Sequence, residues 1–304
     1  MKALVVGGYS LALAFASLGC GVSATPGNDA STQVETQVET SGETSSDVAP
    51  ESTPDVPTSI ACDPATDNAG NPVACVAGRL VDEAGAPVAN LAIGACTLDV
   101  CIRGTTNAEG RYSIGRLTVN PQKMLVFGAA KGYAQMIFYQ DATAGVLSEA
   151  PRDVRLHRLG PPDTAWSADA GGTVSLAGGM LELTAPAGAL LYPIGAEEKV
   201  TALEVDPGEL PPYDIAPWVG KEDATRAFIV NPYPLHTAGP DQPATLTVKG
   251  ATGVAAGTKY TVYAAHSVQG ILEAHGTATA DGEGAIVLDG GTLTDLTTLV
   301  VVPE

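Results

Sequence analysis

From residue 76 onward, short runs of alternating apolar and polar residues are separated by turn residues. A period of two places every second side chain on one face of a β-strand, and Gly, Pro, Asn and Asp between the runs favour turns. The strand-like runs cover residues 76–82, 91–97, 112–117, 124–129, 135–139, 171–176, 181–184, 199–205, 227–230, 244–249, 260–264, 277–279, 285–288 and 298–302. Because no helical stretch separates them, the pattern predicts an all-β fold built from tandem β-sandwich domains.

The β region is interrupted by a segment that resists regular structure, Gly160-Pro161-Pro162-Asp163. Proline fixes its own backbone and lacks an amide donor, so this segment predicts a domain boundary. We expect a first β-sandwich over residues 61–159 and a second β region over residues 163–304. The pattern leaves open whether the second region is one domain or two, with a seam near residues 239–240.

The first twenty residues have the pattern of an export signal. Lys2 is followed by an apolar run over residues 3–18, which is shorter than the roughly 20 residues of a membrane-spanning helix. Ser17-Leu18-Gly19-Cys20 resembles the processing site of bacterial lipoproteins, although the family usually has Leu where Ser17 stands. The resemblance implies removal of residues 1–19 and lipidation of Cys20, which anchors the chain to the membrane. The alternative is an ordinary signal peptide cleaved near Ala24.

The resemblance also bears on the location of the anchor. Gly21 follows the cysteine, where lipoproteins retained in the inner membrane carry aspartate. The resemblance therefore implies an exported protein, lipid-anchored to the cell envelope at the outer membrane. The direction in which it faces is left open.

Residues 20–60 are expected to be a disordered acidic linker that follows the anchor. Residues 21–60 contain seven acidic residues, no Lys or Arg and no aromatic residue, and they include the repeat Gln33-Val34-Glu35-Thr36 and Gln37-Val38-Glu39-Thr40. Such a composition buries too little apolar surface to fold. We expect this segment to act as a spacer between the membrane and the β domains.

Four cysteines remain after Cys20, namely Cys62, Cys75, Cys96 and Cys101. An even number in an exported chain predicts two disulfides, which allows three pairings. We favour Cys62 with Cys75 and Cys96 with Cys101, because each pair closes a short loop. A zinc site is the weaker interpretation, since no CxxC motif is present and no histidine lies between the first and last of these cysteines.

The charge of the chain narrows the expected partners. The sequence contains 34 acidic and 15 basic residues, with a formal net charge of −19. This charge repels phosphate backbones, so nucleic acid is not an expected partner. The membrane, through Cys20, and a polysaccharide or an envelope protein are the expected ones.

Two parts of the chain resemble known β-domain families. The first is carried by Gly78-x-Leu80-x-Asp82-x-x-Gly85-x-Pro87-Val88, Thr106-x-x-Glu109-Gly110-x-Tyr112-x-Ile114 and Gly132-Tyr133. Together these motifs resemble the carboxypeptidase regulatory-like domain, which implies a transthyretin-like β-sandwich without protease activity. Residues 171–176, 181–184, 186–190 and 199–205 resemble the start of ZU5-like β domains.

Catalytic chemistry has little support in the sequence. The candidates are His157, His236, His266 and His275, and the acidic pairs Asp206/Glu209, Glu222/Asp223 and Asp281/Glu283. The histidines lack zinc-binding spacing and are expected to be partly exposed and uninvolved in catalysis, and the acids lack a calcium-binding repeat. We therefore predict no catalytic residue, no cofactor site and no metal site.

The loop over residues 210–218 carries the remaining candidate for ligand binding. It contains three prolines together with Tyr213 and Trp218. If exposed, these rings would stack on a sugar, but burial as local core is the favoured interpretation. The sequence thus favours a non-enzymatic structural or interaction module of the cell envelope. A carbohydrate-binding surface protein is the alternative, and a secreted enzyme is the third.

Overall fold

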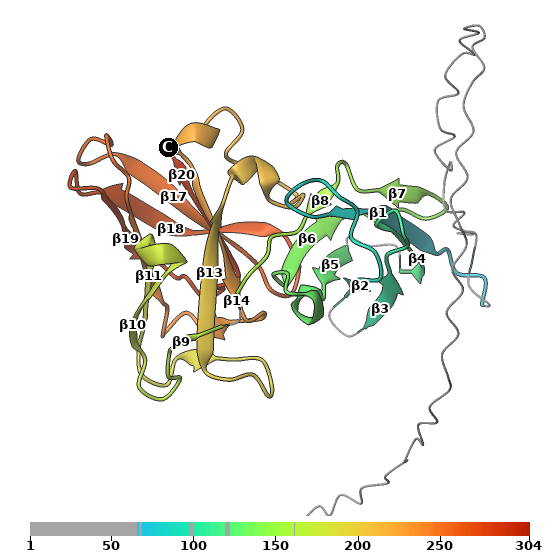
Figure 1. The fold of residues 1–304 in the computed structure, drawn as a ribbon, viewed down its shortest axis with the longest axis horizontal. Coiled ribbons are helices and arrows are strands. Elements are labelled where there is room, and N and C mark those ends of the chain that lie inside the picture. The colour runs from blue at the N-terminus through green and yellow to red at the C-terminus, as the bar shows by residue number, and fades with distance from the viewer. Residues whose placement is uncertain (1–65, 67–68, 98–99, 119–121, 161) are drawn as a thin grey trace, which may run out of the picture. The chain divides into compact units, whose positions relative to one another are not determined.

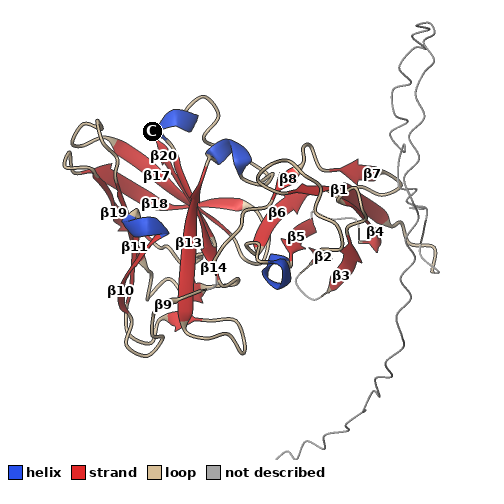
Figure 2. Ribbon diagram, in the orientation of Figure 1, coloured by secondary structure: helices blue, strands red, loops and turns tan. Residues whose placement is uncertain are grey.

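The computed structural model describes residue 66 and residues 69–97, 100–118, 122–160 and 162–304. The predicted signal peptide, Cys20, the predicted linker and Cys62 lie outside these residues. Strands dominate the described part, and its helices are four short 3-10 turns, η1 (Gly128–Lys131), η2 (Ala177–Gly179), η3 (Pro207–Glu209) and η4 (Glu222–Ala224) (Figure 2). The predicted all-β fold is confirmed. No helix in the described part is long and apolar enough to span a bilayer.

Residues 74–160, here called the first lobe, contain two four-stranded sheets (Figure 1). One has β1 (Ala74–Val81) beside β4 (Arg111–Leu117), β7 (Leu147–Glu149) and β8 (Val154–Arg155), and the other has the order β3 (Cys101–Thr105), β2 (Ala92–Cys96), β5 (Gln122–Val126) and β6 (Met136–Gln140). β7 and β8 run parallel to β1, and the other pairs are antiparallel. The periodicity did not predict β3, β7 or β8, because two are very short and β3 is largely exposed.

The glycines and the tyrosine of the first motif have a packing role. A Cβ on Gly78 would lie 2.4 Å from the hydroxyl oxygen of Tyr112, so only glycine leaves room for this ring. The buried Tyr112 hydroxyl donates to Oε1 of Gln140, 3.0 Å away, which ties the two sheets together. Gly110 has φ +74°, and a Cβ there would lie 2.5 Å from the carbonyl oxygen of Leu80. The motif therefore fixes the approach of β4 to β1.

Residues 162–304, here called the second lobe, form one large antiparallel sheet of ten strands. Its order is β10 (Gly172–Leu176), β11 (Leu181–Ala185), β16 (Thr245–Lys249), β19 (Ala285–Gly291), β18 (Leu272–Ala280), β17 (Lys259–Ala265), β20 (Thr298–Pro303), β14 (Arg226–Asn231), β13 (Lys199–Val205) and β9 (Thr164–Ala165). A small pair, β12 (Leu190–Leu191) and β15 (His236–Thr237), lies outside it. Because β11 pairs with β16, a single sheet includes strands from both sides of residues 239–240. The end strands β9 and β10 contact each other, so the sheet wraps around a core.

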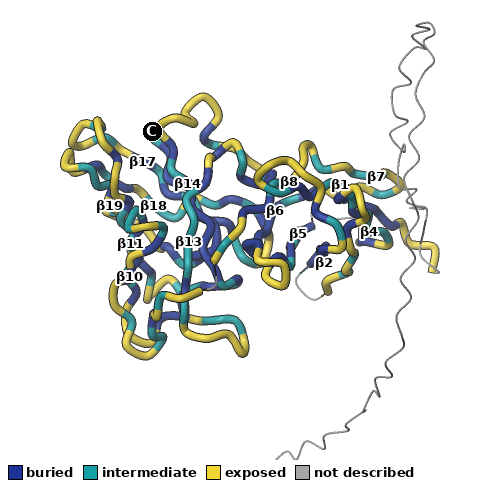
Figure 3. The backbone as a smooth tube through the Cα atoms, viewed as in Figure 1, coloured by how far each residue is buried: buried dark blue, intermediate teal, exposed yellow. Residues whose placement is uncertain are grey.

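Two strands of the second lobe are buried on both faces. Successive side chains of β14 and β20 alternate between two hydrophobic cores, one inside the second lobe and one shared with the first lobe. The inner set is Phe228, Val230, Leu299 and Val301, and the shared set is Ala227, Ile229, Val300 and Val302. This explains why both strands are continuous apolar runs in the sequence. Elsewhere, buried positions follow the strands and the turns are exposed (Figure 3).

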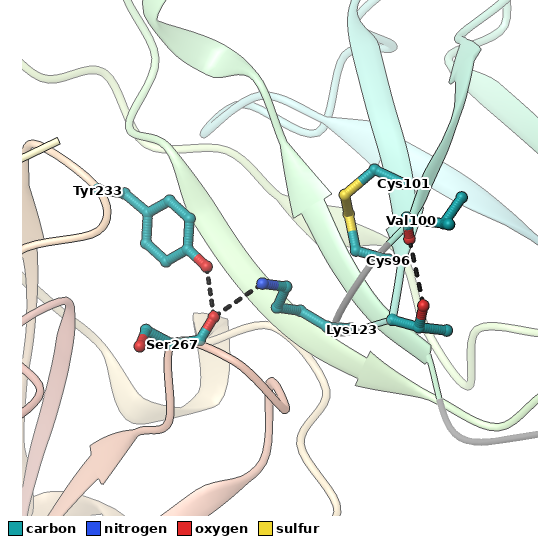
Figure 4. The surroundings of a disulfide bond; sticks show 7 residues. Cys96, Val100, Cys101, Lys123, Tyr233 and Ser267 are labelled. Carbon is teal, nitrogen blue, oxygen red and sulfur yellow. Dashed lines mark hydrogen bonds between the residues drawn. A yellow bond between two sulfur atoms is a disulfide. The ribbon is translucent and has the colours of Figure 1, made fainter. Parts of the chain in front are cut away.

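A disulfide joins Cys96 and Cys101, whose Cα atoms are 4.0 Å apart, and links the adjoining ends of β2 and β3 (Figure 4). This pairing agrees with the favoured one. Cys75 is also disulfide-bonded, but its predicted partner, Cys62, lies outside the described residues, so that pairing stays a prediction.

Thr106 provides a test of how the first lobe is held together. Its buried hydroxyl donates to the Val88 carbonyl at 2.6 Å and accepts from the Leu91 amide at 2.9 Å. We expect Thr106→Val to lower the free energy of unfolding by about 1–3 kcal/mol, because two buried backbone groups lose their partner. Urea unfolding measures this, with the exposed Thr105→Val as the matched control. Equal stability of the two variants would contradict the assignment.

Candidate functional site at the junction of the two lobes

Several polar side chains make contacts where the two lobes meet. Arg152 of the first lobe donates from its two terminal nitrogens to the carbonyl oxygens of Gly208 and Leu210, at 2.7 and 2.6 Å. Arg155, three residues further on, forms an ion pair with Glu209. The two guanidinium groups thus bind the backbone and the Glu209 side chain at the turn η3 of the second lobe. This geometry suits the rigid, forked arrangement of guanidinium donors.

A second polar contact centres on the carbonyl oxygen of Ser267. It accepts from Nζ of Lys123 on β5 at 2.8 Å and from the hydroxyl of Tyr233 at 2.6 Å (Figure 4). The Lys123 ammonium also lies 6.0 Å from the centre of the Tyr233 ring. Burial lowers the pKa of Lys123 from its ordinary value. This lysine therefore binds a carbonyl oxygen and an aromatic face, which partly replace its lost hydration.

The edge strand β6 is covered by the second lobe. The amide of Tyr139 donates to the carbonyl oxygen of Pro212 at 3.1 Å, and the amide of Gln135 donates to Oδ1 of Asn231 at 3.1 Å. An exposed strand edge presents unpaired backbone groups to other chains. Here the second lobe supplies acceptors at both ends of β6, so the junction also protects an edge.

Gly270 permits a close approach of the two lobes. It is buried with φ +73°, and a Cβ there would lie 2.9 Å from the carbonyl oxygen of Phe138 and 3.1 Å from Cγ of Lys123. Any other residue would strain the backbone and push β5 and β6 away. The loop between β17 and β18 can thus reach Lys123 only because it carries glycine at this position.

His157 lies at the same junction and corrects one expectation. It was expected to be partly exposed, but its side chain is only 4% accessible. Its Nδ1 lies 4.0 Å from Oε2 of Glu209. Burial lowers the pKa of His157, and the carboxylates of Glu209 and Glu83 oppose that shift while Arg155 adds to it. The hydrophobic surroundings outweigh the carboxylates, so the neutral form is favoured.

A cavity of about 320 Å³ opens beside the junction. Its walls include Tyr139 and Asp141 of the first lobe and Pro212, Tyr213 and Asp214 of the second. The hydroxyl of Tyr139 donates to Asp141 at 2.8 Å, and burial, helped by this carboxylate, raises the pKa of Tyr139 to about 12. Asp214 in turn accepts from the amide of Leu272 at 2.9 Å. The carboxylates of Asp141 and Asp214 in the cavity wall thus hold local structure through hydrogen bonds.

The two aromatic residues of the proline-rich loop belong to the shared core. Trp218 is 4% accessible, and Tyr213 is partly buried against the same cluster. A sugar cannot stack on Trp218 without displacing this packing. Ile215 of this loop and Val219 just after it, which were not singled out in the sequence, are exposed large side chains, at 43% and 72% accessibility.

The other candidates from the sequence are dispersed. Asp206, Glu222 and Asp223 line one depression with the ion pair of Glu204 and Arg226. Glu209 forms an ion pair with Arg155 instead. Asp281 accepts hydrogen bonds from two backbone amides of its own turn, and these bonds lower its pKa. His236 and His275 lie elsewhere in the second lobe, and Nδ1 of His266 accepts the amides of Val268 and Gln269 in the loop between β17 and β18. Within the described residues, no three His, Cys, Asp or Glu side chains are arranged to hold a metal ion.

Sequence reasoning did not identify most residues of the junction. Arg152, Lys123, Asn231 and Gly270 carry no motif, since each contacts a partner more than 55 residues away. One signal was available. The continuous apolar runs 227–230 and 299–302 require cover on both faces, and this indicates that another part of the chain packs on the outer face.

Replacing Gly270 by alanine tests the tightness of the junction. We expect the native chain to unfold in a single calorimetric transition, because the two lobes share a core. In Gly270→Ala the first and second lobes should unfold at separate temperatures, since the added Cβ displaces β5 and β6. Gly257→Ala is the matched control, because Gly257 has φ +83° but a Cβ there meets no atom within 4 Å. It should retain one transition and cost only the backbone strain, about 1–2 kcal/mol. Two transitions in the native chain would contradict the shared core.

The burial of His157 predicts a pH dependence of stability. Its pKa is lower in the folded chain than the value of about 6.5 expected when unfolded, so the unfolded state takes up a proton first. The contribution of His157 is therefore complete above that value and is lost as the pH falls toward the folded pKa. In urea unfolding at pH 8 and pH 5, His157→Gln should show a smaller loss of stability than the native chain. His275→Gln, a substitution on β18 whose ring contacts the Thr292 carbonyl, is the control, and equal losses in all three proteins would refute the role of His157.

Comparison with known proteins gives little additional information. No protein-family model and no curated protein matches the chain. Among solved structures, a DUF3823 family protein from Parabacteroides merdae is 8% identical, with a TM-score of 0.21, and the match covers 74% of this chain and 80% of that one. The major pilin subunit of Bacillus cereus is 10% identical, with a TM-score of 0.23, over 73% of this chain and 85% of that one. Scores this low do not establish a common fold, and the resemblances to the regulatory-like and ZU5-like domains stay predictions.

Proposed function

We propose that this protein is a non-enzymatic structural module of the bacterial cell envelope, anchored through Cys20. The observation that carries the proposal is the shared core. Ala227, Ile229, Val300 and Val302 of the second lobe belong to the same hydrophobic cluster as the core of the first lobe. Two domains joined only by a flexible linker would reorient freely, whereas a common core resists such motion.

The energetics of the junction favour a single rigid block. Full burial of a Val or Ile side chain contributes about 1.5–3 kcal/mol, and Ile229, Val300 and Val302 each expose 3% or less of their surface. The hydrogen bonds of Arg152 and the ion pair of Arg155 at η3 then add directional contacts that select one orientation of the lobes. A module of this kind suits a part that holds a fixed distance or bears load at a surface.

The sequence supports the envelope location. The apolar run over residues 3–18 and the cysteine at position 20 have the pattern of a lipidated export signal, and the two predicted disulfides suit an oxidising compartment. The acidic linker after the anchor would hold the β lobes away from the membrane. An envelope protein is the partner that we favour, because Trp218 is packed in the core and no exposed aromatic platform of that loop favours a sugar.

Substitution of the anchor residue tests the proposal. In a bacterial host the native chain should be found in the membrane fraction, with a mass that begins at Cys20 and includes fatty acyl groups. Cys20→Ala should be soluble or retained as the unprocessed precursor without acyl groups. Ala24→Leu, which would block only the alternative cleavage site, should behave as the native chain does. A soluble native protein cleaved near Ala24 would overturn the anchoring.

A further inference from the structure

The loop between β12 and β13 carries an isoleucine that is fully exposed. Ile194 has a relative accessibility of 107%, so nothing in the described part of the chain covers it, and Leu191 at the start of the loop is 43% accessible. The amide of Ala196 donates to the carbonyl oxygen of Pro193 at 3.0 Å, and Gly195 has φ +79°. Ile194 therefore occupies a corner of a hydrogen-bonded β-turn, in a loop that is exposed along most of its length (Figure 3).

One buried residue fixes both ends of this loop. The amide of Trp166 donates to the carbonyl oxygen of Glu198 at 3.0 Å, and its carbonyl oxygen accepts from the hydroxyl of Tyr192 at 2.6 Å. The indole N–H of the same residue donates to the Gly172 carbonyl at 3.0 Å, and Trp166 is only 2% accessible. The turn is therefore held in place before any partner arrives, which lowers the entropy cost of binding.

The charged groups that follow the turn in the sequence already have partners. Residues 183–196 contain no Asp, Glu, Lys or Arg. Glu197 forms an ion pair with Lys199 at 2.7 Å, and the Glu198 carboxylate accepts from the amide of Ala168 at 3.0 Å. Insertion of the turn into an apolar medium therefore buries no unpaired charge, which is the step that would cost most.

A second uncharged turn lies beside the loop. Residues 186–188, Pro-Ala-Gly, are exposed, and the amide of Gly188 donates to the carbonyl oxygen of Ala168 at 2.8 Å. Ala168 thus contacts both this turn and Glu198 at the base of the loop. Residues 186–188 and 191–196, here called the apolar tip, present small and aliphatic side chains at this end of the second lobe.

The charge of the second lobe narrows the partner of the apolar tip. Residues 162–304 contain five basic and eighteen acidic residues. A second copy of this lobe would be repelled, and so would lipids with anionic headgroups. A bilayer of uncharged headgroups does not repel the lobe, and it offers an apolar interior to a protruding aliphatic side chain. A sugar gains little from Ile194, because stacking requires an aromatic ring.

We propose that the apolar tip inserts Ile194 into the surface of a bilayer with uncharged headgroups. Burial of one isoleucine side chain corresponds to a gain in partition of about tenfold to a hundredfold. A single myristoyl chain, which is much larger, gives only marginal binding. The tip therefore orients a chain that is already held at the envelope, and it does not replace Cys20 as the anchor.

The membrane that the tip meets rests on the proposed function. A linker that holds the lobes away from the anchor leaves the tip to contact a bilayer that faces it, as the inner and outer membranes of an envelope face each other. The rigid block would then lie between a lipid anchor on one side and a lipid contact on the other. Lipid binding by the tip itself is independent of the anchor.

Paramagnetic line broadening tests the insertion in the mature chain, residues 20–304, carrying Cys20→Ala and hence no lipid. Phosphatidylcholine vesicles with a nitroxide-labelled acyl chain should broaden the amide signals of residues 191–196. Ile194→Ser should lower the partition coefficient, obtained by lipid titration, by about tenfold or more. Val219→Ser is the matched control, because Val219 is also exposed, at 72%, but lies between η3 and η4. It should bind as the Cys20→Ala chain does.

Three outcomes would overturn the insertion. The first is equal partition with and without Ile194→Ser, or broadening at Val219 as strong as at the tip. The second is a shift of the tip signals that grows with protein concentration in the absence of lipid, which would assign the partner to a second copy. The third is binding that requires added phosphatidylglycerol, since this anionic lipid should weaken it. None of these results bears on the anchor, which the fractionation of Cys20→Ala tests separately.

Discussion

The structure depends on the burial of both faces of β14 and β20. A strand in a one-sided sheet alternates apolar and polar residues, but Ala227–Val230 and Leu299–Val302 are apolar throughout. Left uncovered, the outer set of these side chains would form a large apolar patch on the second lobe. The first lobe supplies that cover, and the position of one lobe on the other follows from the need to remove this surface from water.

The polar contacts of the junction determine the orientation of the two lobes more than they determine the stability of the contact between them. An apolar face tolerates sliding, whereas Arg152 reaches two specific carbonyl oxygens and Lys123 reaches one. Each net contribution is modest, because these groups were hydrated before they met. Gly270 has a comparable role through shape, since its missing side chain lets a loop approach the Phe138 carbonyl oxygen of β6. Apolar burial therefore drives the contact, and the arginines, the lysine and the glycine select its geometry.

The sequence predicted the strands well and the junction poorly, for a physical reason. Strand periodicity is local, so the run over residues 199–205 coincides with β13, and residues 244–249 contain all of β16. The strand β3 was missed because its exposed face and Gly104 weaken the alternation. The contacts of the junction are not local. Nothing near Arg152 indicates Gly208, and nothing near His157 indicates Glu209, whose carboxylate lies 4.0 Å from its ring.

Packing between the lobes also explains why His157 and Trp218 are more buried than their sequence surroundings suggest. Both lie in segments that look like surface, the histidine between two arginines and the tryptophan in a proline-rich loop. Because the shared core takes in Trp218 and the turn with Glu209 closes over His157, each becomes part of the interior. Residues that join two lobes thus have the sequence character of loops and the environment of a core. The apolar runs of β14 and β20 are the local sign in the sequence that another part of the chain covers their outer face.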